Sequence, residues 1–93
     1  MTSTNLQEAS SIALQFIGFL VSDEERLERF SALSGMGLGD LKDGAENAVF
    51  QGFLLDYAMQ DEALILSFAE NHNISPEQLA SARRALPGAD HDL

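Results

Sequence analysis

The chain has 93 residues, no cysteine, and 15 acidic against five basic side chains, which gives a formal net charge of -10. This length predicts a single domain, because a second core would bury too little surface. We expect a helical domain over residues 1–88 and a disordered polar tail over 89–93. The missing cysteines exclude disulfides and cysteine nucleophiles, and the charge disfavours nucleic acid and anionic lipid as partners.

Neither a secretory signal nor a membrane span is expected. The N-terminal residues lack a basic start followed by a long apolar stretch, and no segment approaches the ~18 uncharged apolar residues of a spanning helix. We therefore expect a cytoplasmic protein.

Apolar residues recur at three- and four-residue steps along most of the chain, the spacing of helices that lie on a core. The predicted helices cover roughly residues 5–21, 23–35, 40–45, 47–59, 61–73 and 75–86. The expected start signals are the capping-box pairs Asn5–Glu8, Ser22–Glu25 and Ser75–Gln78 and the single caps Asn47 and Asp61. The expected stop signals are Gly35, Asn73 and Pro87-Gly88. The predicted fold class is therefore all-α, a compact bundle of about six helices.

The core is expected where the longest helices meet. Its predicted members on the first, fourth and fifth helices are Phe16, Leu20, Phe50, Phe53, Leu54, Leu64 and Phe68. The inward-facing residues expected on the second and third helices are Leu27, Phe30, Leu33, Leu38 and Leu41. Gly18 suggests a close approach of another helix, because glycine in a helix interior costs about 1 kcal/mol relative to alanine.

The chain also shows an internal repeat. A shift of 38 positions, the separation of Asp23 from Asp61, aligns its two parts. The aligned pairs are Asp23–Asp61, Glu24–Glu62, Phe30–Phe68, Gly35–Asn73, Met36–Ile74 and Leu41–Leu79. We therefore predict two similar three-helix halves related by an approximate twofold. The alternative is coincidence, because any two pairs of amphipathic helices align at some offset.

Several short motifs occur in an order that resembles a known family. They are Phe19-Leu20, Asp23-Glu24-Glu25, Arg29-Phe30, Leu33-Ser34-Gly35, Asp40-Leu41, Phe53-Leu54-Leu55, Asp61-Glu62-Ala63-Leu64, Phe68-Ala69 and Ala82-Arg83-Arg84-Ala85-Leu86. Over roughly residues 9–88 the chain resembles a family of short alphaproteobacterial proteins, the domain of unknown function numbered three-five-seven-two. Gly39 stands where that family would have a helix-starting proline. The resemblance implies a helical fold and a bacterial cytosol, and it implies no activity, cofactor or partner.

Motifs for ligand chemistry are incomplete. The glycines of residues 35–39 lack both the preceding strand of a dinucleotide site and the Gly-Lys-Ser/Thr of a phosphate loop. Residues 40–46 contain three carboxylates, but a calcium loop in the register of Gly44 would need oxygen ligands at positions held by glycine, leucine and phenylalanine. We predict no cofactor, metal site, catalytic residue or small-molecule ligand.

The acidic corners Asp23-Glu24 and Asp61-Glu62 allow two interpretations. They could face each other as an acid–base pair or a metal cradle, but acidic residues at helix starts are also what the helix dipole favours. His72 is expected to stabilise the last turn of its helix, and His91 lies in the tail as a weak metal contact at most. An enzyme is therefore not predicted.

The favoured function is a non-enzymatic protein–protein interaction module, acting by self-association or on another protein. It rests on a surplus of large apolar residues that cover too many helical directions for one buried stripe. These residues are Val49, Phe50, Phe53, Leu54, Leu55, Tyr57, Met59, Leu64, Ile65, Leu66 and Phe68. The predicted interaction surface is Leu55, Met59, Ile65 and Leu66.

Two alternatives use the charges of the chain. A nucleic-acid-associated regulator would use the basic side chains Arg26, Arg29, Arg83 and Arg84, against the global charge. An acidic mimic would occupy a basic site on a nucleic-acid-binding protein. A metal-dependent enzyme at the acidic corners ranks last.

Overall fold

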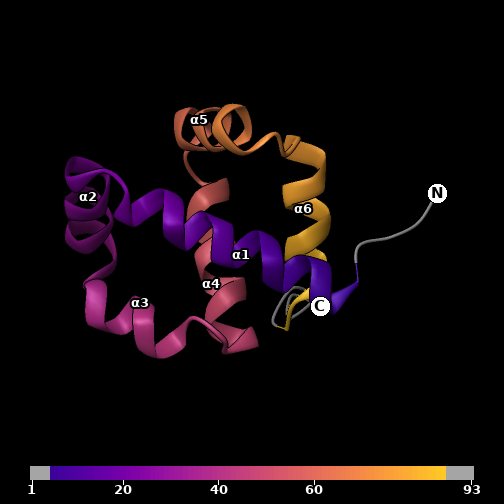
Figure 1. Ribbon diagram of the computed structural model, residues 1–93, viewed down its shortest axis with the longest axis horizontal. Helices are drawn as coiled ribbons and strands as arrows, with labels where there is room; N and C mark the ends of the chain where they lie inside the picture. Colours follow the sequence, from indigo (N-terminus) through magenta and orange to yellow (C-terminus); the bar gives the residue numbers. More distant parts are fainter. Residues whose placement is uncertain (1–4, 88–93) are drawn as a thin grey trace.

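The computed structural model describes residues 5–87, and its regular structure in that range is entirely helical. The helices are α1 (Leu6–Val21), α2 (Glu24–Ser34), α3 (Leu38–Gly44), α4 (Ala48–Met59), α5 (Glu62–His72) and α6 (Pro76–Ala85). Figure 1 shows α1 crossing the molecule, with α2 near one end, α6 near the other and α4 passing behind it. The predicted all-α bundle of six helices is confirmed. The predicted tail over 89–93, with His91, lies outside the described residues.

The predicted caps begin their helices with one exception, and the short α3, for which no cap is predicted, begins at Leu38 and not near residue 40. In α1, Glu8 N donates to Asn5 Oδ1 at 2.7 Å and Asn5 N donates to Glu8 Oε1 at 3.2 Å, which completes the capping box. Ser75 and Gln78 form the same reciprocal pair at the start of α6. Asn47 caps α4 and Asp61 caps α5, as predicted. Local sequence therefore fixes most of the helix boundaries.

The exception is the start of α2, where Asp23 and not Ser22 is the N-cap. Ser22 still has helical backbone angles after α1, and its hydroxyl donates to Phe19 O at 2.9 Å. Asp23 has the extended backbone that an N-cap needs, and its Oδ1 accepts from Glu25 N at 2.9 Å. The capping box predicted for Ser22 is wrong because α2 begins one residue later than expected, at Glu24, which makes Asp23 its N-cap.

The predicted repeat extends to the helix boundaries. α2 and α5 each have 11 residues, each begins behind an aspartate N-cap, and each ends at a left-handed residue, Gly35 or Asn73. Two ring contacts are reciprocal in the repeat: Phe19 lies 5.3 Å from Phe68, and Tyr57, which aligns with Phe19, lies 5.0 Å from Phe30. Such cross-pairing is what an approximate twofold between two halves produces.

The third helices of the two halves break this symmetry. α6 has ten residues and packs extensively against α1 and α4. α3 has seven residues and makes no comparably extensive contact with another helix. One side of α4 is therefore left without the cover that α6 gives to α1.

The core surrounds α1. Phe16 meets Phe68 edge-on at 5.3 Å, and both rings are buried with Leu20 and Leu54, as predicted. Phe50 and Leu64 are only partly buried against this core. No core residue is predicted on α6, but α6 contributes the buried Leu79 and Ala82, and Leu86 directly after it is also buried.

Four predictions about packing are wrong. Phe53 is 38% exposed, and Leu33 and Leu38 are 64% and 49% exposed. These side chains lie on the sides of α4, α2 and α3 that no further helix covers. Gly18 is exposed, and a Cβ there would meet no atom within 4 Å, so no helix approaches it closely.

An ion pair joins α4 to α6 near the C-terminal end of the described chain. The Arg83 side chain is 9% exposed; its Nε and Nη2 donate to Asp56 Oδ1 and Oδ2 at 2.6 and 3.0 Å, and its Nη1 donates to Pro87 O at 3.1 Å. Gly52 makes the room, since a Cβ there would lie 2.8 Å from Nη1. The bidentate geometry fits the planar guanidinium to the carboxylate.

We expect Arg83→Ala to lower the free energy of unfolding by about 2 kcal/mol. The variant loses charge-assisted hydrogen bonds and a buried side-chain stem, and water replaces only part of the loss at half-exposed Asp56. The matched control is Arg84→Ala, at an exposed neighbour, with an expected change within about 0.5 kcal/mol. Urea unfolding measures both, and equal losses would contradict the role of the ion pair.

Substitution by alanine at two glycines should change the free energy of unfolding in opposite directions. Gly35 has φ +78°, so Gly35→Ala should destabilise the protein by about 1 kcal/mol. Gly18 lies inside an exposed turn of α1, so Gly18→Ala should stabilise it by up to about 1 kcal/mol through helix propensity. Thermal and urea unfolding test both variants. Destabilisation by Gly18→Ala would show a close packing contact that the structure lacks.

Candidate interaction surface

Apolar side chains on α2, on α4 and in the turn after α2 form a surface that no helix covers. We call it the α2–α4 face, and it comprises Leu33, Met36, Val49, Phe50, Phe53 and Tyr57. Val49 and Leu33 are 65% and 64% exposed, and Phe53 is 38% exposed. The other three are partly buried and pack against the core. The face therefore combines three exposed apolar side chains with three that pack against the core beneath them.

Ring contacts hold the face in place. Phe30, fully buried in α2, meets Tyr57 of α4 edge-on at 5.0 Å and joins the two helices beneath the surface. Phe50 stacks against Phe53 at 6.1 Å, and the Phe50 ring lies against Gly44, where a Cβ would collide with it. The apolar surface is thus a consequence of packed rings and not of loose side chains.

Three neighbouring hollows run along the face. The first, of about 460 Å³, is lined by Met36, Val49, Phe50 and Phe53 among others. The second, of about 360 Å³, also contains Phe53 and adds Leu33 and Tyr57. Leu33 and Tyr57 continue into the third, of about 590 Å³. Because adjacent hollows share lining residues, they adjoin one another and together make up the groove of the α2–α4 face.

Carboxylates border this groove along its length. Asp40 and Asp43 line the first hollow, and Asp61 and Glu62 line the third. Among the described residues that line the three hollows, Arg29 is the only cationic one, and its Nη2 lies 3.7 Å from Asp61 Oδ2. The border is therefore net negative at both ends.

Tyr57 has an altered acidity in this setting. Burial raises the pKa of its phenol above the ordinary value of 10.0; Arg29 lowers this pKa, and Asp61 raises it further. Burial is the largest effect because the charged phenolate would lose hydration.

The phenolate of Tyr57 should therefore form at higher pH in the folded protein than in the urea-unfolded chain. The chain has one tyrosine and no tryptophan, so ultraviolet absorbance follows this group alone. Because the unfolded chain loses the proton first, folding stability should fall as pH rises above about 10, and Tyr57→Phe should lessen that fall. Equal titration midpoints of the Tyr57 phenol in the folded and unfolded chains would contradict the effect of burial on its pKa.

The four residues predicted as the interaction surface have different surroundings. Met59 and Leu66 are 41% and 54% exposed, whereas Ile65 is partly buried against the core. Leu55 is fully buried, so its assignment to a surface is wrong: this side of α4 lies in the core. The four residues do not form one patch.

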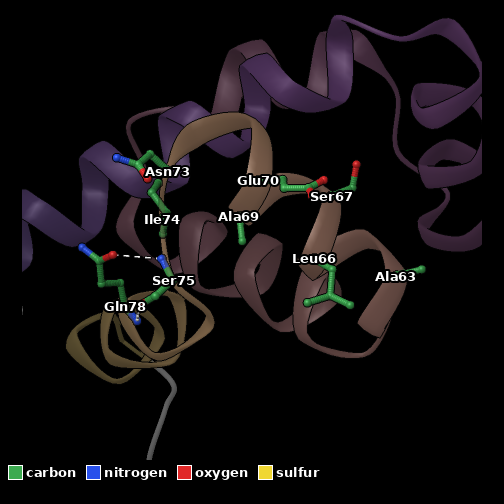
Figure 2. Close-up of a pocket in the computed structure, with 9 residues that line it drawn as sticks. All are labelled: Ala63, Leu66, Ser67, Ala69, Glu70, Asn73, Ile74, Ser75 and Gln78. Carbon is green, nitrogen blue, oxygen red and sulfur yellow. Dashed lines mark hydrogen bonds between the residues drawn. The ribbon is translucent and has the colours of Figure 1, made fainter.

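Leu66 belongs instead to a groove between α5 and α6, of about 840 Å³. Figure 2 shows its lining, with Ala63 and Leu66 on α5 and Asn73, Ile74, Ser75 and Gln78 where the chain turns into α6. Small and polar side chains dominate this α5–α6 groove, and Leu66 is its one large exposed apolar residue. It therefore has fewer exposed large apolar side chains than the α2–α4 face.

Sequence reasoning identified the surplus of apolar residues on α4 but not the side that it exposes. Val49 and Phe53 belonged to that surplus, and Phe53 and Leu33 were placed inward. The useful signal was that α4 is apolar on every side, so that one neighbouring core cannot bury all of it.

The four arginines do not form one basic patch. Figure 1 places α2, with Arg26 and Arg29, far from α6, with Arg83 and Arg84. Arg83 is buried on Asp56. The Arg26 guanidinium lies 3.7 Å from the centre of the Phe19 ring, and its Nη1 donates to Phe19 O at 2.7 Å. Two of the four guanidiniums therefore hold helices together.

The acidic corners serve as helix starts in this structure. Asp23 and Asp61 accept backbone hydrogen bonds as N-caps, and His72 packs against Phe19 and Phe68 with ring centres 5.8 and 4.8 Å away. Within residues 5–87, histidine and acidic side chains form no group of three or more that could hold a metal ion. No helix in this range has the length and apolarity needed to cross a membrane.

These features define a small all-α protein with an uncovered apolar face between α2 and α4. A family model described as a protein of unknown function (DUF3572) matches residues 6–89, so the chain belongs to this family. The family resemblance inferred from the sequence is confirmed, while its alphaproteobacterial origin stays a prediction. Comparison with curated proteins and with solved structures gives no match.

Proposed function

We propose that this protein is a non-enzymatic interaction module of the bacterial cytosol that binds a protein chain through the α2–α4 face. The observation that supports this is the set of adjoining hollows on this face, in which Leu33 and Val49 keep about two thirds of their surface exposed. Contiguous exposed apolar surface on a small protein is typical of a binding site. Covering these side chains would gain free energy that folding leaves unused.

The positions of the four arginines favour protein over nucleic acid as the partner. Recognition of nucleic acid through Arg26, Arg29, Arg83 and Arg84 would need Arg83 to leave its bidentate contact with Asp56. The remaining three arginines lie on two separate helices of a protein with net charge -10. Phosphate binding would work against this field.

A double variant on the face tests the proposal. Leu33→Ser with Val49→Ser removes two apolar contacts that contribute little to the folded monomer, because both side chains are largely exposed. Immobilised wild-type protein should retain a stoichiometric protein from an extract of its source cells, or should associate with itself in sedimentation velocity. The double variant should weaken either association at least tenfold, since each contact is worth about 1–2 kcal/mol.

Two matched single variants control this experiment. Leu14→Ser replaces an exposed leucine of α1 outside the groove and should bind as the wild type does. Leu66→Ser alters the α5–α6 groove, so loss of binding in this variant alone would move the interface there and refute the α2–α4 face. Absence of any stoichiometric partner or self-association would refute the interaction module itself.

A further inference from the structure

Resting on this proposed function, we propose that the occupant of the α2–α4 face is a cationic amphipathic helix of another protein. Shape is the first reason. The three hollows follow one another through shared residues, with Phe53 between the first and second and Leu33 and Tyr57 between the second and third. Exposed apolar side chains of Leu33, Val49 and Phe53 in adjoining hollows can contact the side chains that a helix presents at i, i+3 or i+4, and i+7.

Charge is the second reason, and it predicts that the partner helix is positively charged. Asp40 and Asp43 stand at one end of the groove, and Asp61 and Glu62 stand at the other. The cation Arg29 on the lining is already close to Asp61, and Lys42 of α3 is not part of the lining. Lysine or arginine side chains flanking the apolar stripe of a partner helix would meet these carboxylates from both ends.

The same charges argue against a second copy as occupant. Each copy carries a net charge of -10, and apposed faces would bring the carboxylates of both groove borders together. Like charges across an interface oppose association. Asp56, which lines the second hollow, needs no cation from the occupant, because it is already paired with Arg83.

Three synthetic peptides test the inference with the intact protein. One is a helical peptide with a leucine stripe and lysines on both flanks; the second has glutamate in place of every lysine; the third has the lysine and leucine composition in scrambled order. Isothermal titration calorimetry gives affinities, and amide chemical shifts in NMR spectra map the site. Only the lysine peptide should bind, with shifts concentrated on α2 and α4. Binding should weaken toward about 1 M salt, where the screening length is about 3 Å.

Charge variants at the two ends of the groove supply the matched comparison. Asp43→Asn with Glu62→Gln should weaken the lysine peptide by about threefold to tenfold, as expected for loss of two exposed ion pairs. Glu70→Gln with Glu77→Gln changes the net charge equally on α5 and α6 and should have little effect. Leu33→Ser with Val49→Ser should abolish the shifts on α2 and α4. Equal weakening by both charge pairs would show attraction to net charge alone and would overturn the inference.

The outcomes separate this inference from the function on which it rests. Equal binding of the glutamate or scrambled peptide, or shifts that map to the α5–α6 groove, would refute the cationic helix as occupant. If the lysine peptide fails while the double apolar variant still loses a cellular partner, the cationic helix is refuted and the interaction module stands. If that variant loses no association at all, the α2–α4 face is refuted as a docking site.

Discussion

Burial of apolar side chains around α1 is the constraint on which this structure depends. Without cysteine, the chain has no disulfide to limit its unfolded state, so cohesion comes from packing. Phe16 and Leu20 of α1 are fully buried, and Phe68 reaches them from α5. α6 and α4 cover α1 most extensively. This arrangement determines which sides of the helices remain exposed on the surface.

The uncovered apolar side of α4 reflects a difference in sequence between the two parts of the repeat. The helix boundaries of the two parts correspond from the end of α1 and α4 to the start of α3 and α6. In one part the third helix is long and lies against α1, and in the other it is short and ends at Gly44, beside the Phe50 ring. Val49 and Phe53 correspond at the 38-residue offset to Ser11 and Gln15 of α1, and neither of these is buried. The corresponding side is therefore open in both parts, and it carries large apolar residues only on α4.

Electrostatics complements this apolar surface. The arginines that could have offset the acidic border are used within the fold, Arg83 on Asp56 and Arg26 on the Phe19 ring and carbonyl. The carboxylates at the two ends of the groove therefore keep a negative field around an apolar centre. A surface of this kind discriminates between partners by charge while it gains affinity from apolar contact.

The sequence by itself determined the helices, their caps and the class of fold. Asn5, Asp61 and Ser75 set helix starts, and Gly35 and Asn73 set helix ends, because these signals act within a few residues of the chain. Only the tertiary structure decided which apolar residues are covered. Leu55 and Phe53 lie two positions apart on α4, yet one is fully buried and the other faces solvent, because burial depends on where the other helices dock.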